Sequence, residues 1–200
     1  MTKPTRSTSR ILHHTLDVKG WLASPPSPES ARPGACPDCD APSRPTGGRL
    51  GLHGHGFRDR QLRGPAEASG PPTWIVVACR RYCCVSCAAI LTVVPRGVAP
   101  RRHYGHAAIA MALTLWAIAR EPVAEVRRRV CAWPTTVEDV TRWPTLKRWA
   151  RAARGALGDA SLSLIAAAAR TAQIAIGRAP PSLRRAPREA QAFAGGSAMP

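Results

Sequence analysis

The sequence predicts an α+β protein in which an N-terminal zinc ribbon, a β-hairpin carrying two cysteine knuckles, precedes an all-α helix-turn-helix bundle. Three observations support this prediction. Two Cys-x-x-Cys pairs flank a stretch with strand and turn signals. Helical periodicity dominates the chain after residue 96. One of the expected helices carries a row of basic residues without any acidic ones. We therefore expect a disordered arm (1–10), a zinc-ribbon domain (11–95), a helical domain (96–177) and a disordered tail (178–200).

The two cysteine pairs are the strongest chemical signal in the chain. Each pair places two thiolates two residues apart, so that one tight turn directs both sulfurs at a single ion. Four sulfurs at about 2.3 Å from the ion make a closed tetrahedral zinc site. The expected Zn²⁺ ligands are Cys36, Cys39, Cys84 and Cys87.

Other roles for the cysteines are weaker. A redox motif is expected beside a βαβ pattern, which the sequence lacks, and structural disulfides need an oxidising compartment. Cys83 remains an alternative to Cys84 as the third ligand, and Cys84 is preferred because it keeps the two-residue spacing to Cys87. Cys79 and Cys131 are expected to be small apolar core residues. His53 and His55 are interpreted as polar strand residues, with metal ligation as the alternative.

The residues between and around the cysteine pairs predict strands. A first strand is expected within 47–62, a loose tip at 65–72, and a β-branched return strand at 74–78. Residues 89–94 form a compact apolar run that Pro95 is expected to end. Before the first pair, residues 11–23 predict a short strand followed by a turn of helix from Asp17.

The second half of the chain predicts helices at about 106–120 and from Pro122 to about 132, a short turn through 135–140, and further helices at 142–154 and about 157–176. In the segment 142–154, Leu146, Trp149, Ala150 and Ala153 are expected to face the core. The last helix is interpreted as a packing or dimerisation helix.

Basic residues cover the outer side of the expected helix at 142–154. They are Arg142, Lys147, Arg148, Arg151 and Arg154, with no acidic residue among them. Outward Arg and Lys of a helix-turn-helix recognition helix contact phosphates or guanine edges in the major groove of DNA. The alternative is a solvated basic face on an ordinary helical bundle.

Charge and composition also favour a nucleic-acid partner. The formal net charge is +17 and the pI is about 11.3, and such an excess of positive charge favours anionic partners. The start of the chain is polar, with no apolar segment typical of a secretory signal, and residues 160–169 are too short to span a bilayer. We therefore expect a cytoplasmic, nucleoid-associated protein without membrane contact.

Several motifs resemble a known family. The Cys-Pro-x-Cys pair, the segment His53-Gly54-His55-Gly56-Phe57-Arg58 and the run Arg80-Arg81-Tyr82-x-Cys84-x-x-Cys87 are similar to transposon-associated zinc ribbons. These occur in bacterial insertion-sequence transposases and in short proteins encoded near mobile elements. The resemblance extends over about residues 11–155 and implies a DNA-binding role, with a transposase or a second copy of the chain as further partners. Glycine commonly follows each cysteine pair in that family, whereas Asp40 and Ala88 stand here, so we expect these turns to be slightly strained.

The sequence does not favour catalysis. An insertion-sequence transposase holds two metal ions with three carboxylates on an RNase H-like sheet. None of the acidic residues after the ribbon lies on a recognisable strand, and no Gly-rich phosphate loop is present. We expect a zinc-dependent DNA-binding protein of mobile-element type without a catalytic domain. The alternatives are a protein-interaction or accessory subunit of transcription or transposition machinery, and a degenerate transposase fragment.

Overall fold

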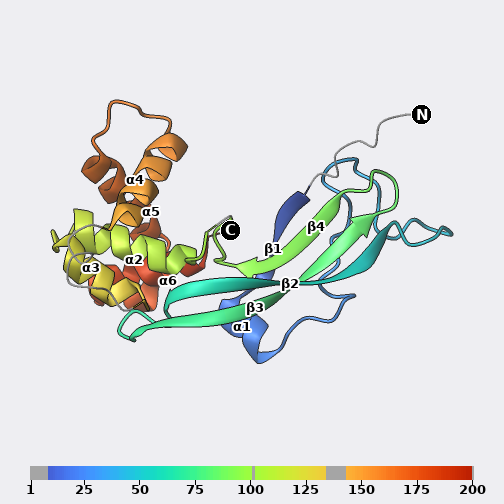
Figure 1. Cartoon of the computed structure of the whole chain (residues 1–200), viewed down its shortest axis with the longest axis horizontal. Helices are drawn as coiled ribbons and strands as arrows, with labels where there is room; N and C mark the ends of the chain where they lie inside the picture. The colour runs from blue at the N-terminus through green and yellow to red at the C-terminus, as the bar shows by residue number, and fades with distance from the viewer. Residues whose placement is uncertain (1–8, 101, 134–142, 200) are drawn as a thin grey trace. The chain divides into compact units, whose positions relative to one another are not determined.

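The structure, a computed structural model, describes residues 9–100, 102–133 and 143–199 (Figure 1). The chain divides into two compact units. Unit 1 comprises Met1–Arg60 and Val76–Arg96, and unit 2 comprises Gln61–Ile75 and Gly97–Pro200.

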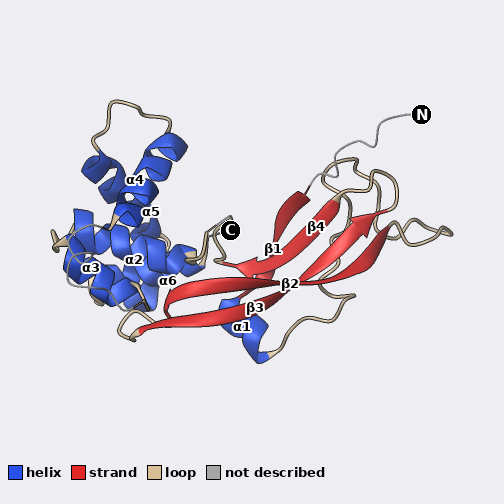
Figure 2. Cartoon of the chain, in the orientation of Figure 1, coloured by secondary structure: helices blue, strands red, loops and turns tan. Residues whose placement is uncertain are grey.

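The four strands form one mixed sheet in the order β1-β4-β3-β2 (Figure 2). In chain order the strands are β1 (Ser9–Asp17), β2 (Leu52–Pro65), β3 (Pro72–Cys84) and β4 (Ile90–Arg96). β1 pairs in parallel with β4, from Ser9 opposite Ile90 to His13 opposite Val94. β3 pairs antiparallel with β4, from Arg80 opposite Val93 to Cys83 opposite Ile90.

This sheet corrects the predicted fold. The protein is α+β, but the arrangement of a zinc-ribbon hairpin followed by an all-α helix-turn-helix bundle is wrong. β1 is an integral strand of a four-stranded sheet, and the ends of β2 and β3 belong to unit 2, which is therefore not all-α. The parallel pairing joins segments some eighty residues apart, and local residue patterns carry no signal for such a distant partner.

The helix α1 (Val18–Ala23) follows β1 directly, as the sequence predicted. Asp17 caps it, accepting a hydrogen bond from the Gly20 backbone N–H at 2.8 Å. Its buried Trp21 donates a ring N–H to the Ala78 carbonyl at 3.1 Å, which fixes α1 to β3.

The sequence predicted that Pro95 ends the preceding strand. Pro95 instead lies within β4. The pairing of β4 with β3 runs from Ile90 to Val93, and its register with β1 shifts between His13 and Asp17. Pro95 therefore lies at an irregular part of the sheet, where proline is tolerated.

The remaining helices of the described residues lie in unit 2. They are α2 (His106–Ala117), α3 (Val123–Val130), α4 (Pro144–Leu157), α5 (Leu164–Gly177), the 3-10 turn η2 (Pro181–Leu183) and α6 (Arg188–Ser197). α2 is buried on nearly all sides and packs against α3, α4, α5 and α6. Tyr104, Trp143 and Trp149 meet edge to face, with ring centroids 5.0 to 6.1 Å apart, and hold α4 to this core.

The segment before α4, where a helix-turn-helix would have its first helix and its turn, is described only for residues 131–133 and 143. Among the described residues α4 packs on α5 and α2. The turn predicted through 135–140 lies outside the described residues.

The prediction of a disordered tail over 178–200 is wrong for η2 and α6. A Cβ atom at Gly195 would lie 1.8 Å from the Ala175 carbonyl oxygen, and one at Gly196 would lie 2.8 Å from the His106 carbonyl oxygen. The two glycines thus let α6 approach the backbones of α5 and α2 more closely than any other residue would allow.

Candidate metal centre

Two loops with the same backbone geometry carry the cysteine pairs. In the first, the Cys36 N–H donates to the Ala41 carbonyl at 2.9 Å, and the Asp40 N–H donates to the Cys36 carbonyl at 2.8 Å. In the second, the Cys84 N–H donates to the Ala89 carbonyl and the Ala88 N–H donates to the Cys84 carbonyl, both at 3.0 Å. The five-residue spacing is identical, so the two loops are repeats of one turn.

Each turn requires a left-handed residue at its fifth position. Asp40 has φ of 54° and Ala88 has φ of 59°. This backbone costs a residue with a Cβ atom about 1–2 kcal/mol, and aspartate tolerates it better than alanine. The strain expected from the absence of glycine at these positions is therefore present.

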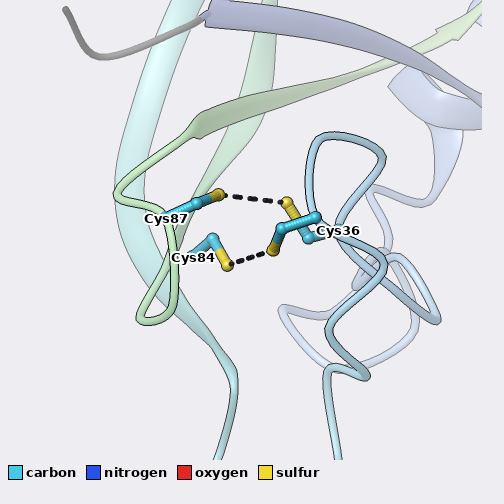
Figure 3. A group of neighbouring side chains, drawn as sticks. Cys36, Cys84 and Cys87 are labelled. Carbon is cyan, nitrogen blue, oxygen red and sulfur yellow. Dashed lines mark hydrogen bonds between the residues drawn. The ribbon is translucent and has the colours of Figure 1, made fainter. Parts of the chain in front are cut away.

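The four sulfurs face one another across the two loops (Figure 3). The Sγ atoms of Cys36 and Cys87 are 3.7 Å apart, as are those of Cys39 and Cys84. All four lie within 4.8 Å of one another. Four sulfurs at about 2.3 Å from one ion would be separated by about 3.8 Å in a regular tetrahedron. A disulfide needs about 2.05 Å, and all seven cysteines are free. The group can hold a metal ion, and its donor set suits zinc.

Gly51 connects the two loops, and the sequence did not identify it as a site residue. Its N–H donates to the Ser43 carbonyl at 2.8 Å, and its carbonyl accepts from the Val85 N–H at 2.9 Å. A Cβ atom at this position would lie 2.3 Å from the Pro42 carbonyl oxygen, so only glycine fits. On the other side of the first loop, the Arg10 Nε donates to the Asp38 carboxylate at 2.6 Å and links the loop to β1.

The sulfurs influence each other's ionisation. Burial raises the pKa of Cys84, but hydrogen bonds from the backbone N–H groups of Cys87 and Ser86 and from neighbouring thiols lower it to about 7. The Ala89 N–H lowers the pKa of Cys87, whereas burial and the other three sulfurs raise it to about 12. Four adjacent thiolates repel one another, and a divalent cation removes that repulsion.

The other candidate ligands lie outside this group. Cys83 is adjacent in sequence, but its sulfur lies outside the group and is 3.8 Å from the Cys84 carbonyl oxygen. Cys79 is buried, and its burial raises the pKa of its thiol to about 11. Cys131 is half-buried and accepts a hydrogen bond from the Tyr104 hydroxyl at 3.3 Å. His53 and His55 are exposed on β2.

The predicted DNA-contacting residues lie in unit 2. Lys147, Arg148 and Arg151 are exposed on α4. Arg154 is half-buried, and its Nη1 lies 3.5 Å from the Leu162 carbonyl oxygen, at the limit of a hydrogen bond. Arg142 lies outside the described residues.

Comparison with protein-family models, with curated proteins and with solved structures found no match. Among the described residues, no helix has the length and apolar character needed to cross a bilayer.

Replacing Ala88 by glycine should stabilise the protein by about 1 kcal/mol, because glycine adopts the left-handed backbone without strain. Asp40→Gly should give a smaller gain, since aspartate is the better tolerated residue. The matched control is Ala78→Gly, at an exposed position of β3 without positive φ, which should lose about 0.5–1 kcal/mol. Urea unfolding at saturating zinc measures the free energy of unfolding of all three variants. An equal loss of stability in Ala88→Gly and Ala78→Gly would show that the backbone at Ala88 is not strained.

Proposed function

We propose that this chain is a zinc-dependent protein that binds duplex DNA through α4 and has no catalytic role of its own. In this proposal zinc fixes the two cysteine loops of unit 1, and the exposed face of α4 in unit 2 supplies the DNA contacts. The resemblance of its sequence motifs to those of transposon-associated proteins adds the further proposal that its DNA belongs to a mobile element.

The exposed face of α4 is the observation that carries the DNA proposal. Leu146, Trp149 and Ala150 are buried and fix the rotation of the helix. Lys147, Arg148 and Arg151 are thereby left on the outside, and within the described part of the chain none of them makes a hydrogen bond or an ion pair. No acidic residue lies on the helix. A stripe of unpaired cations is the electrostatic complement of a phosphate backbone.

The zinc proposal rests on the donor set and its spacing. Four thiolates in two Cys-x-x-Cys turns match structural zinc sites, which are closed and tetrahedral. Backbone N–H groups that donate to the sulfurs, as at Cys84, also orient the ligands and moderate their charge.

The absence of catalysis is proposed from the placement of the acidic residues. Across residues 9–100, 102–133 and 143–199, the four cysteines are the only group of three or more metal-ligating side chains. Glu125 pairs with Arg128, and Glu189 pairs with Arg129 at 3.5 Å. Glu138 and Asp139 lie outside the described residues.

Replacing Lys147, Arg148 and Arg151 together by alanine should weaken binding to a mixed-sequence duplex and flatten its salt dependence. Each phosphate contact contributes a slope of about −0.9 to a plot of log affinity against log salt concentration, so three lost contacts should reduce the slope by about 2.7. Fluorescence anisotropy over a range of salt concentrations measures both quantities.

A triple alanine variant at Arg178, Arg184 and Arg185 is the matched control. These three arginines are exposed in the same unit and removing them changes the charge equally. An equal loss of slope in the control variant would show attraction by total charge instead of contact through α4. If the wild-type protein shows no salt-dependent binding to duplex DNA, the DNA-binding proposal is wrong. The alternative is then that the metal centre contacts another protein.

A further inference from the structure

We propose that Phe57 and Arg80, in unit 1, form a stacking site for an unpaired base of a single-stranded nucleic acid. This site is separate from the duplex contacts assigned to α4, and it does not depend on them. Neither the metal centre nor the sheet needs the Phe57 ring in its exposed position.

The Phe57 ring is exposed although it is one of the largest apolar side chains of β2. Its exposed fraction is 58%. The guanidinium carbon of Arg80 lies 4.8 Å from the ring centroid, within the range of a cation–π contact. One side of the ring therefore rests on a cation, while more than half of the residue remains in contact with water.

A hydrogen bond to the backbone fixes the Arg80 side chain. Its Nε donates to the Pro26 carbonyl at 2.7 Å, which ties the side chain to the loop after α1. The loss of side-chain freedom has thus already occurred before any ligand arrives. A fixed platform binds a planar ligand at a lower entropic cost than a mobile one.

A second aromatic–arginine pair of unit 1 shows the same arrangement in a covered state. The Arg32 guanidinium lies 5.7 Å from the centroid of the Tyr82 ring. Tyr82 is buried, and its hydroxyl donates to the Pro28 carbonyl at 2.6 Å. There the protein's own loop covers the ring. Within the described structure no such cover lies over most of Phe57.

The surroundings of Phe57 allow a strand of nucleic acid to approach. β2 is an edge strand, and residues 53–59 are all exposed. At Gly54 and Gly56 a Cβ would meet no atom within 4 Å other than those of the flanking residues, so the backbone beside Phe57 is open. His53, His55 and Arg58 offer cations or hydrogen-bond donors to phosphates, against one acidic residue, Asp59. Basic residues interleaved with an exposed aromatic ring are typical of single-strand binding surfaces.

The ligand class follows from the stacking geometry. A base paired inside a duplex has both faces covered, so only an unpaired base can stack on Phe57. Every base has a π-face, so the site should tolerate any sequence.

The test measures the affinity of the full-length zinc-loaded protein for a single-stranded oligothymidine of about 12 nucleotides by fluorescence anisotropy. Phe57→Ala should weaken binding about 5- to 150-fold, the range found when a stacking aromatic is removed. Phe57→Trp should retain the affinity, whereas Phe57→Leu, which is apolar but has no π-face, should lose nearly as much as alanine. Val76→Ala, at another exposed apolar position of unit 1, should change nothing.

Three results would overturn the proposal. The first is an absence of single-strand binding by the wild-type protein. The second is an unchanged affinity in Phe57→Ala. The third is full affinity in Phe57→Leu, which would indicate general apolar contact. The α4 triple variant distinguishes the two sites when it is assayed with the same oligothymidine. Adding Phe57→Ala to that variant should still weaken single-strand binding.

Discussion

Removing zinc should unfold the loops of unit 1 and leave α2, α4 and α5 folded. Residues 24–51 contain no helix and no strand beyond an isolated bridge, and only four of their side chains are buried: Pro26, Ala31, Cys36 and Ser43. A segment with so little apolar burial depends on its metal, and structural zinc binds zinc-finger peptides with about 10–16 kcal/mol. The core of unit 2 contains none of the four ligands.

Hydrogen exchange followed by mass spectrometry resolves this effect segment by segment. Chelation, or the substitution Cys84→Ser, should remove protection from residues 24–51 and 84–90 while protection in α2 persists. Cys83→Ser is the matched control, because its sulfur lies outside the group, and it should behave as the wild type. Identical exchange with and without zinc would contradict a structural metal centre.

Gly195→Ala should destabilise unit 2 by about 3 kcal/mol, at the upper end of the usual cost of overpacking. The added Cβ would lie 1.8 Å from the Ala175 carbonyl oxygen, and a backbone atom cannot rotate away as a side chain can. The helices must therefore separate, which exposes the buried Ala192 and Ala175.

Urea unfolding and limited trypsin digestion together measure this change. Detachment of α6 should speed cleavage at Arg184 and Arg185 in the connection between α5 and α6. Gly155→Ala provides the control, because a Cβ at that exposed position of α4 meets nothing within 4 Å. It should stabilise α4 by about 0.5–1 kcal/mol. Equal stability of Gly195→Ala and the wild type would mean that α6 is not packed as described.

Sequence reasoning found the parts of the molecule that local rules control. The two-residue spacing of each cysteine pair is a local property, and it identified the four side chains that the structure brings together. Asp17 as the start of α1 and Leu146, Trp149 and Ala150 as the buried side of α4 follow from capping and periodicity.

The features that the sequence did not reveal depend on distant partners. The parallel pairing of β1 with β4 joins Ser9 to Ile90, and its register is decided only in the folded sheet. Gly51 looks like any loop glycine until the Pro42 carbonyl is placed against it. The C-terminal segment was interpreted as disordered because it is rich in Gly, Ala, Pro and Arg, yet its small residues are what allow α6 to pack tightly against α2 and α5.

X-ray absorption spectroscopy at the zinc edge can establish whether the protein holds a four-cysteine zinc centre. The spectrum of the purified protein should fit one shell of four sulfurs at about 2.3 Å, and Cys83→Ser should leave it unchanged. A shell containing nitrogen or oxygen, or fewer than four sulfurs, would contradict the assignment of Cys36, Cys39, Cys84 and Cys87 as the ligands.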